Sequence, residues 1–231
     1  MSIRHNNHFK IFFFILFMNI FEINLILLLC PILGICKSNN ICVLKKCYAS
    51  DSSISKTYDK DESRYINLGY SSREQNRLPE AEGYFNKALE INPKSYNAYV
   101  GLGWCFSQQN RLPEAEGYFK KAVEINPKSD DAYRGLGWCS QEQGRTPEAE
   151  GYFKKSLEIN PRNYDAYIGL GWCSKDQNRL PEAEGYFKKA AEINPKSDDA
   201  YIGLGRCYQE ELNVLEADKF FKKGMILRID Q

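Results

Sequence analysis

From residue 62 onward, apolar residues recur at steps of three and four, which is the spacing of an amphipathic helix. One such face, within residues 96 to 106, consists of Ala98, Tyr99, Leu102, Gly103 and Phe106. The next one consists of Tyr118, Phe119, Ala122 and Ile125. Neither helix can bury its apolar face alone, so the pattern predicts antiparallel helix pairs that stack on one another.

Polar residues and prolines mark the ends of these helices. Asn110 and Arg111 predict a turn between them, and Pro113 is expected at the first position of the second helix, where its missing N–H costs nothing. Glu116 and Lys120 are spaced as an i, i+4 ion pair. Pro127 lies just beyond the expected end of the second helix, which it cannot extend.

The same helix pair is repeated with a period of 34 residues, visible in two series of prolines. One series starts each PEAEGYF-like segment, at Pro79, Pro113, Pro147 and Pro181. The other closes each unit, at Pro93, Pro127, Pro161 and Pro195. Five units fit, spanning 62–95, 96–129, 130–163, 164–197 and 198–231. They are preceded by an apolar segment, residues 1–36, and a polar linker, residues 37–61.

The repeated residues resemble the tetratricopeptide repeat, whose signature is W-x2-L-G-x2-Y, then A-x3-F, then P. The second unit matches it with Tyr99-x2-Leu102-Gly103-x2-Phe106, Ala115-x3-Phe119 and Pro127. Tyr replaces the first Trp, and serine replaces the later aromatic residue in three units, at Ser72, Ser140 and Ser174. The resemblance implies an all-α fold, an α-solenoid built as a superhelical stack of antiparallel helix pairs. It also implies a concave groove, formed by the first helices, that binds a protein or peptide.

The family's groove positions place an aromatic series along the stack at the ninth residue of each unit: Tyr70, Trp104, Trp138, Trp172 and Arg206. The sixth residue is glycine in four units, at Gly101, Gly135, Gly169 and Gly203. Arg134, Asp131 and Asp165 are further candidate groove residues. The aromatic rings are either anchors for a partner or packing residues that lie against the glycines of the adjacent unit, and helical spacing favours packing.

Charge narrows the class of partner. Residues 1 to 49 carry five basic residues against one acidic residue, which leaves a net charge of −3 on the rest of the chain. A mildly acidic body argues against a nucleic-acid partner. Near the aromatic series, basic residues (Arg73, Arg134, Lys175, Arg206) are outnumbered by acidic ones (Glu74, Asp131, Glu142, Asp165, Asp176, Asp199, Glu210). A partner with apolar and basic character is favoured.

Residues 11 to 36 are dominated by Phe, Ile and Leu and flanked by basic residues, which indicates a membrane-directed segment. Polar residues including Glu22 split it into halves, each about as long as a signal-peptide core. A continuous span would hold Glu22 near the bilayer centre at roughly 2.5–3.5 kcal/mol. A cleaved signal and a retained anchor both stay open, with a lipidated Cys36 or a buried helix less favoured. We therefore expect a membrane-anchored or exported protein, on an unspecified side of the membrane.

Catalysis finds little support in the sequence. Both histidines, His5 and His8, precede the apolar segment, so the units hold none for acid–base chemistry or metal ligation. The carboxylates at the start of the second helices are repeated, whereas an active site would be unique. We expect no enzyme activity, no cofactor and no metal site.

The cysteines fall into two groups. The first group occupies equivalent positions in four units, which stack about 10 Å apart, beyond the roughly 7 Å limit between disulfide-bonded Cα atoms. We expect free thiols there, at Cys105, Cys139, Cys173 and Cys207. The second group could form disulfides in an oxidising compartment, without a predicted pairing, at Cys30, Cys36, Cys42 and Cys47.

The function indicated by the sequence is a scaffold for protein–protein interaction. An aromatic series could alternatively stack against sugars, so a module that binds carbohydrate or an envelope polymer is the second hypothesis. The last helix, with Met225, Leu227 and Ile229, is expected to leave apolar surface, and self-association through that end is a further possibility.

Overall fold

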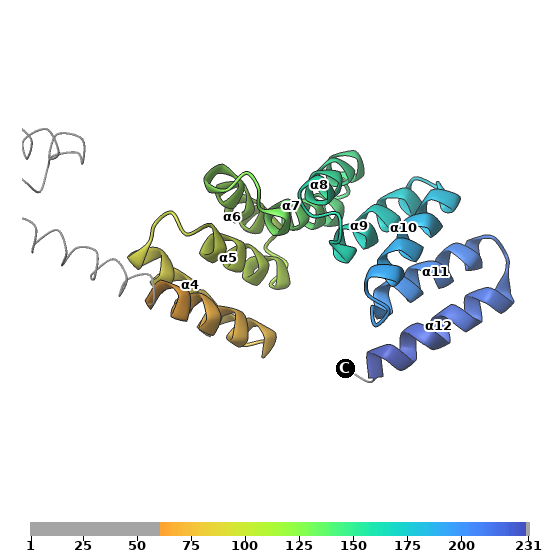
Figure 1. Cartoon of the computed structure of the whole chain (residues 1–231), viewed down its shortest axis with the longest axis horizontal. Helices are drawn as coiled ribbons and strands as arrows, with labels where there is room; N and C mark the ends of the chain where they lie inside the picture. Colours follow the sequence, from red (N-terminus) through yellow and green to blue (C-terminus); the bar gives the residue numbers. More distant parts are fainter. Residues whose placement is uncertain (1–60, 230–231) are drawn as a thin grey trace, which may run out of the picture. The chain divides into compact units, whose positions relative to one another are not determined.

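The computed structural model describes residues 61–229, and within them every regular element is a helix. The apolar segment, most of the linker and the cysteines at positions 30, 36, 42 and 47 lie outside the described residues. A helix over residues 61–74 comes first. It is followed by α4 (Leu78–Ile91), α5 (Tyr96–Gln108), α6 (Leu112–Ile125), α7 (Asp130–Glu142), α8 (Thr146–Ile159), α9 (Tyr164–Asp176), α10 (Leu180–Ile193), α11 (Asp198–Glu210) and α12 (Val214–Ile229) (Figure 1).

The helices form pairs, and the pairs stack in the order of the sequence. The first helices of the units are the one over residues 61–74, α5, α7, α9 and α11, and each packs against the second helix that follows it. Second helices also pack against the first helix of the next unit, and α5, α7, α9 and α11 contact one another in succession. This arrangement confirms the expected α-solenoid of antiparallel helix pairs.

The first helices α5, α7, α9 and α11 each begin at a specific polar residue, and most of the first helices are closed by another. At its start, the side chain of Ser95, Ser129, Asn163 or Ser197 accepts a hydrogen bond from the backbone N–H three residues later. At the end of α5, Asn110 adopts a left-handed backbone conformation (φ 60°) and the Arg111 N–H donates to the Phe106 carbonyl, which closes the helix. Asn76, Gly144 and Asn178 occupy the equivalent position in other units with the same sign of φ.

The second helices begin one residue earlier than expected. Leu112 is the first residue of α6, so Pro113 stands at the second position and not at the first. The shift has no energetic consequence, because the first four N–H groups of a helix lack a partner within the helix. Glu116 and Lys120 form the predicted ion pair at 2.6 Å, and Glu150–Lys154 and Glu184–Lys188 repeat it.

The last unit departs from the turn pattern at Leu212. This residue has φ 60° where other units have Asn or Gly, and its side chain is 85% exposed, so it gains little from packing. A left-handed conformation costs a bulky residue roughly 1–2 kcal/mol, and Asn tolerates it better. We expect Leu212→Asn to raise the free energy of unfolding by about 0.5–1 kcal/mol in chemical denaturation. Asn110→Leu is the matched reverse change and should lower it. A stabilising effect of both substitutions would contradict this reading of the turn.

The core is a column of phenylalanines from the second helices, each pressed between two glycines. Phe85, Phe119, Phe153 and Phe187 are all completely buried. The ring of Phe153 lies so close to Gly137 of its own unit and Gly169 of the next that a Cβ atom at either glycine would come within 3.0 Å of it. The interpretation that the indoles occupy the space left by the glycines is therefore wrong. The phenylalanines fill it, because they project from the helix that lies between two first helices.

The repeated cysteines behave as expected. Cys105, Cys139, Cys173 and Cys207 are free and buried. Burial raises the pKa of the Cys105 thiol to about 11 and that of Cys139 to about 12. These side chains pack as small apolar residues.

Candidate functional site: the first-helix face

The aromatic side chains of the ninth position are only half-buried, and each packs on the core phenylalanine of its own unit. Trp104 meets Phe119 edge to face, with ring centroids 5.0 Å apart, and Trp138 meets Phe153 at 5.5 Å. Tyr70–Phe85 and Trp172–Phe187 repeat the arrangement. One side of each ring therefore contributes to packing, and the rest of the ring belongs to the surface of the first helices. We call this surface, which is formed by the helix over residues 61–74, α5, α7, α9 and α11, the first-helix face.

Arg134 joins three units across this face. Its guanidinium lies over the Trp104 ring, 4.4 Å from the centroid, and donates to Asp131 on its own helix. It also donates to Asp165 of the next first helix, with Nη1 and Oδ2 2.8 Å apart. The candidate residues Arg134, Asp131 and Asp165 thus form one cluster with Trp104, and the Arg134 charge is taken up within the protein.

The other basic residues of the face also have partners within the protein. Lys175 forms an ion pair with Glu210 at 2.8 Å, which links α9 to α11. Arg206 is exposed and lies 5.9 Å from the centroid of the Trp172 ring, and Arg73 lies 5.6 Å from that of Tyr70. The two arginine side chains, Arg73 and Arg206, stack on rings of the aromatic series and cover part of the ring surface.

The sequence did not indicate that Arg228 takes part in the charge network of the face. Arg228, near the end of α12, reaches back to α11 and donates to Asp198 and Asp199 at 2.6 and 3.1 Å. Asp199 occupies the position of Asp131 and Asp165 in the fifth unit, and its charge is also balanced from inside the protein. The contact with Asp198 has equivalents in other units, where Asn stands at the position of Arg228. Asn92 donates to Glu62, and Asn160 donates to Asp130. In the last unit the donor is a cation.

Burial and neighbouring carboxylates raise the pKa of two acidic residues of the face, Asp165 and Asp199. Burial raises the pKa of Asp165, and Arg134 opposes that rise only in part, because Asp131 and Asp199 add to it. The pKa of Asp199 is raised by its burial and by Asp198. Holding these ionised carboxylates close together therefore costs free energy.

Two carboxylates near the C-terminal ends of α7 and α9 are different. Glu142 and Asp176 are exposed, and neither takes part in an ion pair within residues 61–229. Each stands where the helix dipole is negative, which is unfavourable for an anion. A cation from outside the protein would relieve that repulsion.

Two kinds of feature are absent from the residues that the structure describes. No helix between residues 61 and 229 is long and apolar enough to cross a membrane. Nor does that region bring three or more His, Cys, Asp or Glu side chains together as a possible metal site.

The fold and this face define a class of protein, the tandem array of helical hairpins. Models of the tetratricopeptide repeat match residues 72–137 and 137–198. The chain belongs to the tetratricopeptide repeat family, whose fold serves as a scaffold for protein–protein interaction. Among curated proteins, none matches the sequence.

Solved structures share the fold at low sequence identity. PilF of Pseudomonas aeruginosa is 22% identical, with a TM-score of 0.65 over 73% of this chain and 78% of that chain. PilW, a type IV pilus biogenesis factor, is 24% identical, with a TM-score of 0.65 over 72% and 77%. YrrB, a tetratricopeptide-repeat protein with an unusual peptide-binding site, is 24% identical, with a TM-score of 0.53 over 78% and 93%. These likenesses show the fold alone.

Proposed function

We propose that this protein is a scaffold that binds a protein or peptide partner across the first-helix face, through a segment with apolar and basic side chains. The proposal includes attachment to, or export across, a membrane through the N-terminal segment. YrrB, which has the same fold, has a peptide-binding site, and this supports a peptide or protein as the ligand.

The distribution of charge on the face carries the proposal. Its basic residues are engaged by carboxylates or aromatic rings of the protein, whereas Glu142 and Asp176 are free of ion pairs in the described region. The half-buried rings of Trp138 and Trp172 belong to the same two helices. A partner would meet apolar rings beside negative charge, which favours a basic amphipathic segment.

The test uses the full-length protein in detergent and two synthetic peptides with the same apolar residues, one with lysine and one with glutamate at its polar positions. We expect the lysine peptide to bind at least about tenfold more tightly, and more weakly as salt rises, since each exposed charge pair contributes up to about 1 kcal/mol. Replacing both carboxylates, Glu142→Lys with Asp176→Lys, should remove this preference.

The control is Lys155→Glu, which changes an exposed charge on the second helix α8. It should leave the preference intact. Equal binding of both peptides to all variants would refute the charge argument. Binding to glycans in place of both peptides would favour the carbohydrate hypothesis.

A further inference from the structure

The last helix, α12, exposes apolar side chains that the other second helices do not have. Leu215 is 80% exposed, Met225 63% and Ile229 83%. In earlier units the positions of Leu215 and Ile229 are prolines, and the position of Ile226 is an exposed glutamate. Only the exposure of Met225 follows from its place at the end of the described stack, because its equivalents are half-buried against a following unit. The exposed apolar side chains of Leu215, Ile226 and Ile229 instead result from residues that differ from those of the earlier units.

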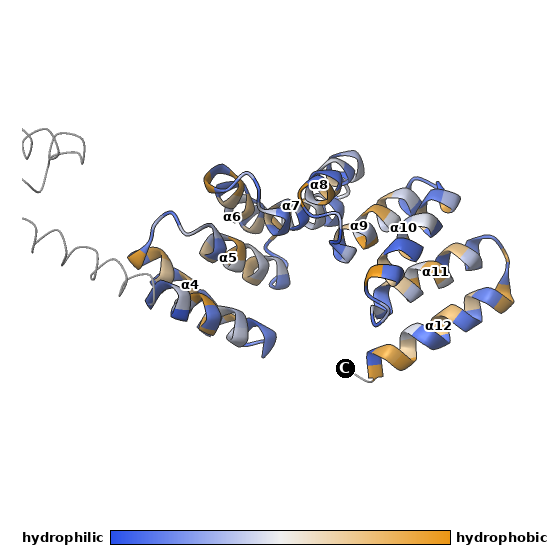
Figure 2. Cartoon of the chain, in the orientation of Figure 1, coloured by the Kyte–Doolittle hydropathy of each residue, from blue (hydrophilic) through white to orange (hydrophobic). Residues whose placement is uncertain are grey.

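These residues follow the spacing of a helix–helix seam. Leu215, Asp218, Lys222, Met225 and Ile229 are separated by steps of three, four, three and four. Such spacing places them on one stripe of a helix, as in the a and d positions of a coiled coil. Figure 2 shows hydrophobic colouring at both ends of α12 and polar colouring between them. The stripe is therefore apolar at its ends and charged at its centre.

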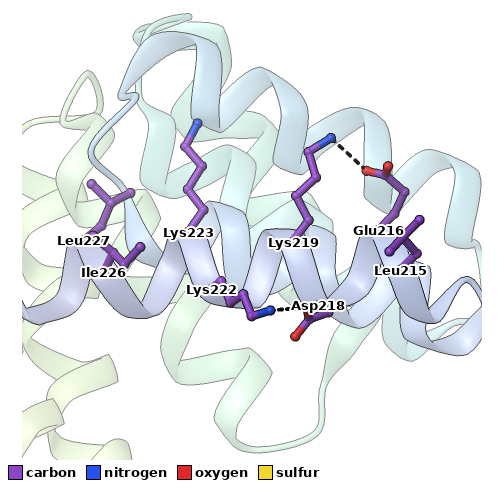
Figure 3. A pocket seen from close by; sticks show the side chains of 8 residues that line it. All are labelled: Leu215, Glu216, Asp218, Lys219, Lys222, Lys223, Ile226 and Leu227. Carbon is purple, nitrogen blue, oxygen red and sulfur yellow. Dashed lines mark hydrogen bonds and ion pairs between the residues drawn. The ribbon is translucent and has the colours of Figure 1, made fainter.

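The charged centre contains one acid and one base. Asp218 and Lys222 form an ion pair at 2.5 Å, and their side chains remain 55% and 70% exposed. Figure 3 shows this pair on one side of α12, with Lys219, Glu216 and Lys223 on the other. Each charge therefore remains open to a second partner.

We infer that α12 docks antiparallel on α12 of a second copy of this chain. In an antiparallel pair centred near Phe220, Leu215 lies opposite Met225 of the second copy, and Asp218 lies opposite Lys222 of the second copy. Twofold symmetry makes each contact twice, which gives two apolar layers outside two ion-pair layers. The stripe is thus complementary to itself in both apolarity and charge. This association is independent of the partner proposed for the first-helix face.

A head-to-tail stack of copies fits the structure less well. Each inner phenylalanine packs against the sixth-position glycine of the next unit, as Phe187 does against Gly203. The first unit has Asn67 at that position, and a side chain there would obstruct Phe221 of a preceding copy. The tail-to-tail arrangement avoids this contact.

The experiment mixes two differently tagged full-length copies in detergent and measures their co-purification, together with sedimentation as a function of concentration. Asp218→Lys and Lys222→Asp, each alone, would put like charges opposite one another and should weaken self-association at least about tenfold. The double exchange, Asp218→Lys with Lys222→Asp, should restore it.

Mixing the two single variants separates the interface from the ion pair within the helix. That internal pair stays broken in both chains, yet Asp218→Lys and Lys222→Asp chains should bind each other in preference to themselves. Glu216→Lys is the control, because it breaks the Lys219 pair on the other side of α12 and should have no effect. A monomer at all concentrations, or self-association that ignores these charges, would overturn the inference.

Discussion

Replacing Phe153 with alanine is expected to lower the free energy of unfolding by about 3–5 kcal/mol, the range for a fully buried aromatic side chain. The ring has no exposed surface, and it contacts Gly137, Gly169 and the ring of Trp138. Its removal leaves a cavity between two units, and the two glycines on either side have no side chains that could fill it. Denaturant unfolding of the full-length protein in detergent, followed by helical circular dichroism, would measure the loss.

Phe221→Ala provides the matched control. Phe221 is the equivalent residue of the last unit and packs on Gly205, but it is half-buried, since no following unit covers it in the described region. Its loss should cost about half as much, because the transferred area and the cavity are both smaller. Equal costs at both positions would show that the contact with the next unit contributes little.

The period, the helix pairs and their ends could be predicted because they depend on short-range rules. Proline positions, helical spacing and a polar turn residue such as Asn110 act within a few residues of one another. The i, i+4 pair of Glu116 and Lys120 could be foreseen for the same reason. Even here the start of the second helix was predicted one residue too late, because proline is tolerated at either of the first two positions of a helix.

The contacts between units could not be predicted in the same way. From the sequence, either Trp138 or Phe153 could fill the space left by the glycines, and only the direction of each side chain decides which one does. The three-unit contact of Arg134 with Trp104 and Asp165 depends on how far each first helix is offset from the next. The sequence therefore identified the candidate residues of the face and left open which charges are already paired.

Two glycines in neighbouring helices should respond in opposite ways to alanine. Gly151 in α8 is exposed, and an added Cβ would meet nothing within 4 Å. Gly151→Ala should therefore stabilise the protein by up to about 1 kcal/mol through helix propensity. Gly169 in α9 is buried against Phe153, whose ring cannot retreat because Gly137 holds its other side. Gly169→Ala should destabilise by about 1–3 kcal/mol, since overpacking outweighs the same gain in propensity.

A double-mutant cycle tests whether Phe153 causes this difference. In the Phe153→Ala background the ring is absent, so Gly169→Ala should lose its penalty and become neutral or stabilising, like Gly151→Ala. The coupling between positions 153 and 169 should then be about 1–3 kcal/mol, whereas that between 153 and 151 should be close to zero. An unchanged penalty at Gly169 without the ring would mean that the glycine is required by the α9 backbone and not by the phenylalanine column.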